Sequence, residues 1–202
     1  MKLYYSPGSC SLSIHIALRE ASLDFDLEKI DARAKKTASG GDYLAINPNG
    51  YVPALELDDG QILTECSAIL QYIGDKNANL KLTPPAGTLE RYRLQEWLSF
   101  LSTELHKGFG PLFNPTATDA FKETVAEKLR RRFGWMDQQL DGRDFLMGSQ
   151  FTVADAYGFT IASWTDRMKI DRSSMSHLDD YMERVAARPH VEAAMRAEGL
   201  LN

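Results

Sequence analysis

The sequence predicts an α/β domain followed by an all-helical domain. Strand and helix patterns alternate only over residues 1–76, whereas every periodic segment after residue 87 has helical spacing. The boundary is indicated by residues 79–87, which contain Pro84-Pro85 and lack periodicity. We therefore predict a first domain over 1–78, a linker over 79–87 and a helical domain over 88–202.

The first domain opens with a strand, a turn and a helix. Lys2–Tyr5 is a short apolar run that ends at Ser6-Pro7-Gly8. Apolar residues on several sides of Ser11–Ala21 predict a buried helix. Phe25–Asp31 alternates apolar and charged residues, as a second strand does. Residues 32–41 are polar and are predicted to form a loop.

A hairpin and a helix complete the first domain. The Asp-Gly pair at 59–60 lies between the short apolar runs Val52–Leu57 and Gln61–Thr64, which predicts two antiparallel strands. Glu65–Lys76 then has helical spacing. The expected result is a mixed four-stranded sheet with helices.

The helical domain is predicted from repeated apolar stripes. Thr88–Lys107 carries leucines spaced by four, three and four residues, and Gly108 and Pro111 end the pattern. Asp119–Leu140 repeats this spacing. Thr152 and Asp155 form a capping signature that opens a further helix. A last helix is expected over 178–188, ending at Pro189.

The composition excludes several classes of protein. The 202 residues are 44% apolar and 25% charged with a formal net charge of −5, typical of a soluble globular protein. Nucleic acid is not an expected partner, because its phosphates require a clustered basic face. Charges interrupt every apolar run before the ~18 residues that a membrane span needs. No apolar stretch of signal-peptide length opens the sequence, which predicts a cytoplasmic location.

Cys10 is the main candidate for chemistry. It follows the Pro-Gly turn at the start of a helix, where the helix dipole favours a thiolate. The alternative is a small buried apolar residue. A serine, Ser13, stands where a dithiol oxidoreductase would have its second cysteine. We therefore expect no resolving thiol nearby, and a mixed disulfide between Cys10 and a small external thiol.

Three further positions of the first domain suit a peptide-like, anionic ligand. Val52 precedes a proline at a strand start, where its backbone could pair with an extended ligand. Glu65 opens a helix and could hold an ammonium group, and Lys35 could pair with a carboxylate. An edge proline, a simple helix cap and a solvated lysine are the respective alternatives.

In the helical domain, Ser99, Thr103 and His106 are spaced by four and three residues and form one polar stripe. The stripe could line a cleft or could be a solvated helix face, and His106 is its best proton donor or acceptor near neutral pH. No histidine shows the spacing of a metal ligand, so we predict no metal.

Six motifs together resemble the glutathione transferases, closest to the bacterial beta class, and they cover essentially the whole chain. They are MKLYYSPGSCSLS, LAINPNGYVPALELDDG, LTE followed by AILQYI, LQEWLSFLSTELHKGF, FTVADAY and ARPHVEAAMRAEGL. The resemblance implies a thioredoxin-like first domain that binds glutathione, a helical domain that completes the site for a hydrophobic electrophile, and a homodimer.

The resemblance also implies site residues. The catalytic residues are Cys10, supported by Ser11, and His106. The glutathione-binding positions are Cys10, Lys35, Val52, Glu65, Cys66, Ser99, Thr103, Glu104 and His106. In this arrangement Glu65 receives the γ-glutamyl group, Val52 the cysteinyl backbone and Lys35 the glycyl carboxylate. The chain departs from the family at Cys66, where Gly or Ser is common, at Ser99, where Asn is frequent, and at Ile14, which replaces a proline.

The predicted function is conjugation of reduced glutathione, the co-substrate, to hydrophobic electrophiles, with thiol-disulfide exchange or peroxidase activity through Cys10. Two alternatives remain open at this point. One is a non-catalytic ligand-binding or interaction protein of the same fold. The other is a glutathione-dependent dehalogenase.

Overall fold

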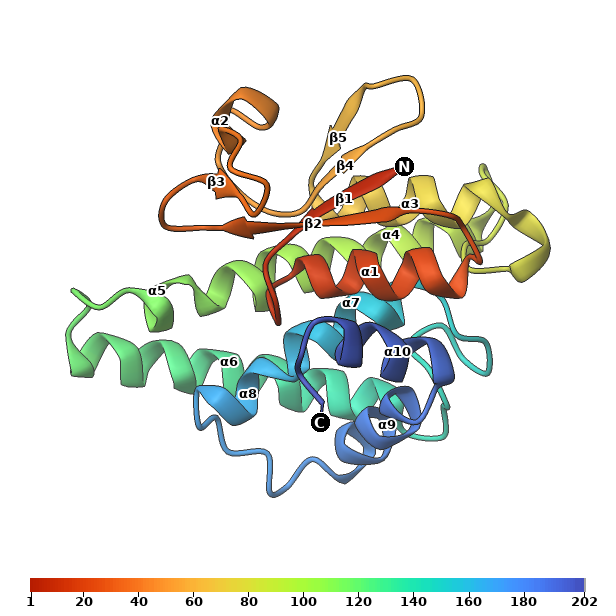
Figure 1. Ribbon diagram of the computed structural model, residues 1–202. Helices are drawn as coiled ribbons and strands as arrows, with labels where there is room; N and C mark the ends of the chain where they lie inside the picture. The colour runs from red at the N-terminus through yellow and green to blue at the C-terminus, as the bar shows by residue number, and fades with distance from the viewer. Residues whose placement is uncertain (202) are drawn as a thin grey trace. The chain divides into compact units, whose positions relative to one another are not determined.

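The computed structural model describes residues 1–201. They divide into two compact units (Figure 1). The first unit is Met1–Thr83 together with the chain from Arg188 onward, and the second is Pro84–Ala187. Among these residues, no helix combines the length and the apolar character needed to cross a membrane.

A mixed five-stranded sheet forms the centre of the first unit, with strand order β3-β2-β1-β4-β5. The strands are β1 (Lys2–Tyr5), β2 (Asp26–Asp31), β3 (Lys36–Thr37), β4 (Ala54–Glu56) and β5 (Ile62–Thr64). β1 runs parallel to β2 and antiparallel to β4, and β4 pairs antiparallel with β5. The predicted mixed sheet and the hairpin are therefore confirmed.

The sheet has one strand more than the sequence predicts. β3 lies in the segment expected to be a loop and pairs with β2 through Ile30 opposite Thr37 and Asp31 opposite Lys36. A two-residue strand is too short to show an alternating pattern, so periodicity could not reveal it.

Helices of the first unit pack on the sheet and on one another. They are α1 (Ser11–Glu20), α2 (Tyr43–Ile46), α3 (Cys66–Lys76), the 3₁₀ turn η1 (Ala78–Leu80) and α10 (Pro189–Ala197). Figure 1 shows α1 along one side of the sheet, and it contacts β1, α3 and α10. Nine of its ten residues are buried, which accounts for apolar residues on several of its sides.

The end of the chain differs from the sequence prediction. The sequence predicts that Pro189 ends the last helix, but Pro189 occupies the first turn of α10. Proline suits that position because its missing N–H would be unpaired there in any helix. Residues 188–201, which the sequence places in the helical half, pack in the first unit. Val191 and Ala194 are fully buried, and Arg188 forms a 2.7 Å ion pair with Glu20.

The second unit is entirely helical. Its elements are α4 (Leu89–Phe100), η2 (Leu101–His106), η3 (Lys107–Phe109), α5 (Gly110–Phe113), α6 (Asp119–Leu140), α7 (Val153–Ala162), α8 (Trp164–Arg167) and α9 (Ser176–Ala186). The leucine stripe of the predicted helix over 88–107 is fully buried. The helix is not uniform, since η2 has π-helical geometry and η3 is a 3₁₀ turn. Leu101 and Leu105 both remain buried across this change.

Candidate functional site

Cys10 lies at the N-cap of α1, directly after the turn at Pro7 and Gly8. Gly8 adopts φ +66°, a conformation that favours glycine. Cys10 is 7% exposed, and its thiol donates a hydrogen bond of 3.2 Å to the Val52 carbonyl. A helix N-terminus favours an anion through its backbone N–H groups. The predicted position of Cys10 at a strand-turn-helix corner is thus present in the structure.

The Ser11 hydroxyl stabilises this turn through hydrogen bonds. This buried hydroxyl accepts a hydrogen bond of 3.1 Å from the Ser6 N–H and also lies 2.8 Å from the Ser9 hydroxyl. Ser11 therefore supports the conformation of the segment that carries Cys10.

A buried carboxylate near the chain end holds the same turn. Glu198 accepts hydrogen bonds of 2.9 Å from the Gly8 N–H and from Nδ1 of His15. Arg19 donates to Nε2 of His15, so this nitrogen is the acceptor and the proton lies on Nδ1. Both the His15 and Glu198 side chains are fully buried. Burial of the Tyr5 side chain raises its pKa, and the negative charge of the Glu198 carboxylate raises it further.

Sequence reasoning missed Glu198 as a residue of this region. The partners Gly8 and Glu198 are 190 positions apart in the chain. No local motif marks such a pair, and it arises only because α10 packs against α1.

Val52 lies beside Cys10 and outside the β4 ladder, which begins at Ala54. The bond between Val52 and Pro53 is cis. The preceding loop is fixed by the Tyr51 carbonyl, which accepts from the Tyr43 hydroxyl at 2.7 Å and from the Asn47 amide at 2.8 Å. The Val52 carbonyl, which the sequence suggested to be available to a ligand, accepts from the Cys10 thiol.

Glu65 and Cys66 open α3. Glu65 is the N-cap residue and adopts φ +70°, which is rare for a residue with a side chain. Strained backbone of this kind is concentrated at functional sites. The Glu65 side chain is exposed. Cys66 is 5% exposed, and its sulfur lies 3.9 Å from the Cys10 carbonyl oxygen.

The sulfur atoms of Cys10 and Cys66 lie within 4.8 Å of each other, and neither residue is in a disulfide. The expectation that Cys10 has no second thiol nearby is therefore wrong. That expectation considered only Ser13, one turn along the same helix. Cys66 is 56 positions away in sequence and arrives because α1 and α3 pack together.

Lys35 lies against the loop that leads to Val52. Its Nζ donates a hydrogen bond of 2.7 Å to the Gly50 carbonyl and sits 5.9 Å from the centre of the Tyr51 ring. Lys35 is therefore not a fully solvated surface lysine, and its ammonium group is held at this loop.

The remaining predicted residues lie in the second unit, on α4 and η2. Ser99 and Thr103 are exposed, and the Thr103 hydroxyl donates to the Ser99 carbonyl. Glu104 accepts a 2.8 Å hydrogen bond from Arg132.

His106 has an aromatic setting. Its Nδ1 lies 2.7 Å from the Tyr157 hydroxyl, and its ring meets the rings of Tyr157 and Trp164 edge to face. The hydrogen bond at Nδ1 and the two ring contacts fix the orientation of the His106 ring.

Comparison with known protein families identifies two domains in the chain. A family model of the glutathione S-transferase N-terminal domain matches residues 8–76. A second model, of the glutathione S-transferase C-terminal domain, matches residues 100–189.

Individual relatives agree with these matches over nearly the whole length. The chain is 44% identical to glutathione S-transferase GstA of Escherichia coli O157:H7, over 99% of this chain and 100% of that protein. A solved ternary complex of BphK, a bacterial GST, is 52% identical with a TM-score of 0.97, over 99% and 100% of the two chains. A sphingomonad glutathione S-transferase complexed with glutathione is 47% identical with a TM-score of 0.96, over 100% of both chains.

Proposed function

The chain belongs to the glutathione S-transferase family, and from that premise we propose that it conjugates reduced glutathione to hydrophobic electrophiles and exchanges disulfides through Cys10. One observation carries the proposal. The Cys10 thiol stands at the start of α1, 3.2 Å from the Val52 carbonyl and close to the start of α3.

Each part of glutathione has a complementary group in the first unit. The γ-glutamyl group carries an ammonium and a carboxylate, which suit the exposed Glu65 side chain and the backbone N–H groups that open α3. The cysteinyl backbone suits an extended pairing with Val52, and the glycyl carboxylate suits the Lys35 ammonium. We propose residues 1–78 as the glutathione-binding domain on this basis.

The proposed conjugation is a displacement at carbon. The glutathione thiol loses its proton, the thiolate forms a bond to the electrophile, and the leaving group departs with its electron pair. Donors near the sulfur favour the thiolate, and a fixed orientation of the two reactants lowers the barrier. We assign His106 a catalytic role on the family resemblance and on the fixed orientation that Tyr157 gives its ring.

The proposed electrophile region is aromatic. In the second unit, Phe109, Phe113 and Trp164 form a cluster in which the tryptophan meets both phenylalanine rings edge to face at 5.4 Å. Phe113 is 44% exposed and can offer its ring to an apolar molecule. Ser99, Thr103 and Glu104 remain proposed contacts of glutathione.

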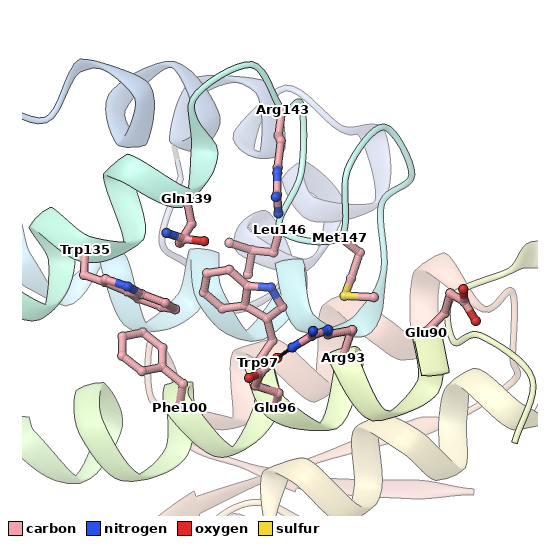
Figure 2. A pocket seen from close by; sticks show the side chains of 10 residues that line it. All are labelled: Glu90, Arg93, Glu96, Trp97, Phe100, Trp135, Gln139, Arg143, Leu146 and Met147. Atoms are coloured by element: carbon pink, nitrogen blue, oxygen red, sulfur yellow. Dashed lines mark hydrogen bonds and ion pairs between the residues drawn. The ribbon is translucent and has the colours of Figure 1, made fainter. Parts of the chain in front are cut away.

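We also propose a homodimer that covers one face of the second unit. A groove of about 540 Å³ lies between α4, α6 and the segment after α6. Figure 2 shows the side chains that line it. Its aromatic residues are Trp97, Phe100 and Trp135, and its charged residues are Glu90, Arg93, Glu96 and Arg143. Charges of both signs beside an apolar centre suit a two-fold contact between identical surfaces. The protein is proposed to act in the cytoplasm and without a metal.

The proposal is tested by binding and by exchange. Reduced glutathione should raise the melting temperature in a concentration-dependent manner, because it binds only the folded protein. Oxidised glutathione should release one or more equivalents of glutathione thiol per wild-type chain and none with Cys10→Ala. No melting shift, together with no turnover of an activated chloroaromatic compound, would show that the protein is not a transferase.

A further inference from the structure

The first unit contains two thiols that lie close together. Cys10 is the N-cap residue of α1 and Cys66 is the first residue of α3. The two side chains are nearly buried, their sulfur atoms lie within 4.8 Å, and Cys66 approaches the backbone of Cys10. Both thiols stand at helix N-termini, which favour the thiolate form.

We propose that Cys66 is the resolving thiol of Cys10, so that the pair forms an intramolecular dithiol-disulfide couple. This inference rests on the proposed disulfide exchange at Cys10. It differs from a monothiol cycle, in which Cys10 exchanges only with an external thiol.

The reaction has two balanced steps. In the first, the Cys10 thiolate attacks a disulfide of glutathione, an S–S bond forms at Cys10 and one glutathione thiolate leaves. In the second, the Cys66 thiolate attacks the Cys10 sulfur and displaces the second glutathione thiolate. Each leaving thiolate takes up the proton that the attacking thiol released. The two protein thiols are oxidised, and one glutathione disulfide is reduced to two glutathione thiols.

The geometry makes the second step competitive with attack by an external thiol. Closing the bond brings the two sulfur atoms to about 2.05 Å, which requires rotation about the Cα–Cβ bonds of these side chains. A group held this close to its target acts at a high effective concentration. Two molecules of reduced glutathione then return the pair to the dithiol, one by forming the mixed disulfide and one by releasing glutathione disulfide.

The first test follows the protein species by intact mass after reaction with oxidised glutathione and an acid quench. Wild type should lose two hydrogens and carry little adduct. Cys66→Ser should hold at least about tenfold more glutathionyl adduct, located at Cys10, because attack by the neighbouring thiol is absent. Cys10→Ser, the matched control, should form neither species.

The outcomes separate this inference from the proposed function. If wild type holds the mixed disulfide to the same extent as Cys66→Ser, Cys66 is not a resolving thiol although exchange at Cys10 stands. If neither protein is oxidised and neither releases glutathione thiol, exchange at Cys10 is wrong and this role for Cys66 is wrong with it.

A second test needs only the wild-type protein. An intramolecular disulfide consumes two molecules of reduced glutathione for each glutathione disulfide formed, whereas a mixed disulfide exchanges one for one. When total glutathione is diluted about tenfold at a constant ratio of its two forms, the ratio of oxidised to reduced protein should therefore rise about tenfold. A ratio that does not change on dilution would contradict the intramolecular couple.

Discussion

At the scale of single residues, the candidate site depends on how one backbone carbonyl and one buried side chain place the segment around Cys10. The Cys10 thiol is oriented by the Val52 carbonyl, and the turn before it is held by Glu198. Cys10 could be found from its place after Pro7-Gly8, because the local sequence creates that setting. Glu198 and the approach of Cys66 could not, because each depends on packing between segments far apart in the chain.

Cys10→Ala should separate the two proposed activities. Disulfide exchange should fall to background, since the attacking sulfur is removed. Conjugation uses the sulfur of glutathione and should fall by no more than about tenfold, because the groups that orient glutathione remain. Initial rates with an activated chloroaromatic compound and with a mixed disulfide substrate give this comparison. Equal loss of both activities would contradict separate roles.

Glu198→Ala should destabilise the protein strongly. The substitution leaves the Gly8 N–H and Nδ1 of His15 without their acceptor in a buried region, at a cost of about 3 kcal/mol. Glu192→Ala is the matched control on α10, because Glu192 is half-exposed and pairs with Arg196 at the surface. Thermal unfolding followed by circular dichroism should show a large loss for the first variant and almost none for the second. Equal losses would mean that the buried contacts contribute little.

At the scale of elements, α7 begins with a capping motif whose carboxylate is completely buried. The capping signature predicted at Thr152 is confirmed, since the Asp155 carboxylate accepts from the Thr152 N–H at 2.8 Å and from the Thr152 hydroxyl at 3.0 Å. It also accepts from the Leu146 N–H at 2.8 Å. The motif predicts the cap, but not the contact with Leu146 or the complete burial of the carboxylate.

Burial gives Asp155 a pH-dependent effect on stability. Its pKa is raised to about 6 from 3.8, because burial penalises the charged form more than the hydrogen bonds favour it. A raised folded-state pKa means that the carboxyl group stabilises the fold most below its unfolded pKa, and that this contribution is lost as the pH rises through the folded pKa.

The test compares wild type with Asp155→Asn, which cannot titrate. Between pH 4 and 7, wild type should lose roughly 2–3 kcal/mol of unfolding free energy relative to the variant, as a shift of about two pKa units implies. Urea unfolding at several pH values, followed by circular dichroism, measures this difference. If the difference in unfolding free energy between the two proteins stays constant with pH, or if wild type becomes relatively more stable as the pH rises, burial does not disfavour the charged form of Asp155.

The other elements differ in how well their sequence pattern predicts them. Long periodic patterns predicted the helices well, and α6 occupies the residues expected, Asp119–Leu140. Short elements such as β3 and α2 have too few residues to show a period. The sequence pattern does not predict the last helix, α10, because Pro189 indicates a helix end, although proline is equally suited to a helix start.

At the scale of the whole molecule, the aromatic groove of the second unit gives the proposed dimer a direct test. Trp135 and Phe121 both lie on α6 and are 40% and 51% exposed, but only Trp135 lines the groove. The two positions are separated by roughly 20 Å along the helix, at 1.5 Å per residue. They therefore form a matched pair of sites for a charged substitution.

Trp135→Glu should convert the dimer to a monomer, because it places a charge in the centre of the proposed contact. Phe121→Glu should leave the dimer intact. Sedimentation velocity over a range of protein concentrations measures both, with circular dichroism as the check on folding. A wild-type protein that is monomeric, or a Trp135→Glu variant that remains dimeric, would contradict an interface at this groove.

The division of the chain into two units also divides its natural reporter groups. All three tryptophans, at positions 97, 135 and 164, belong to the second unit, whereas both cysteines belong to the first. Indole emission in a denaturant titration therefore follows one unit, and the rate of labelling by a thiol reagent follows the other. The wild-type chain thus carries two independent probes, and the difference between their midpoints measures the cooperativity between its halves without any engineered label.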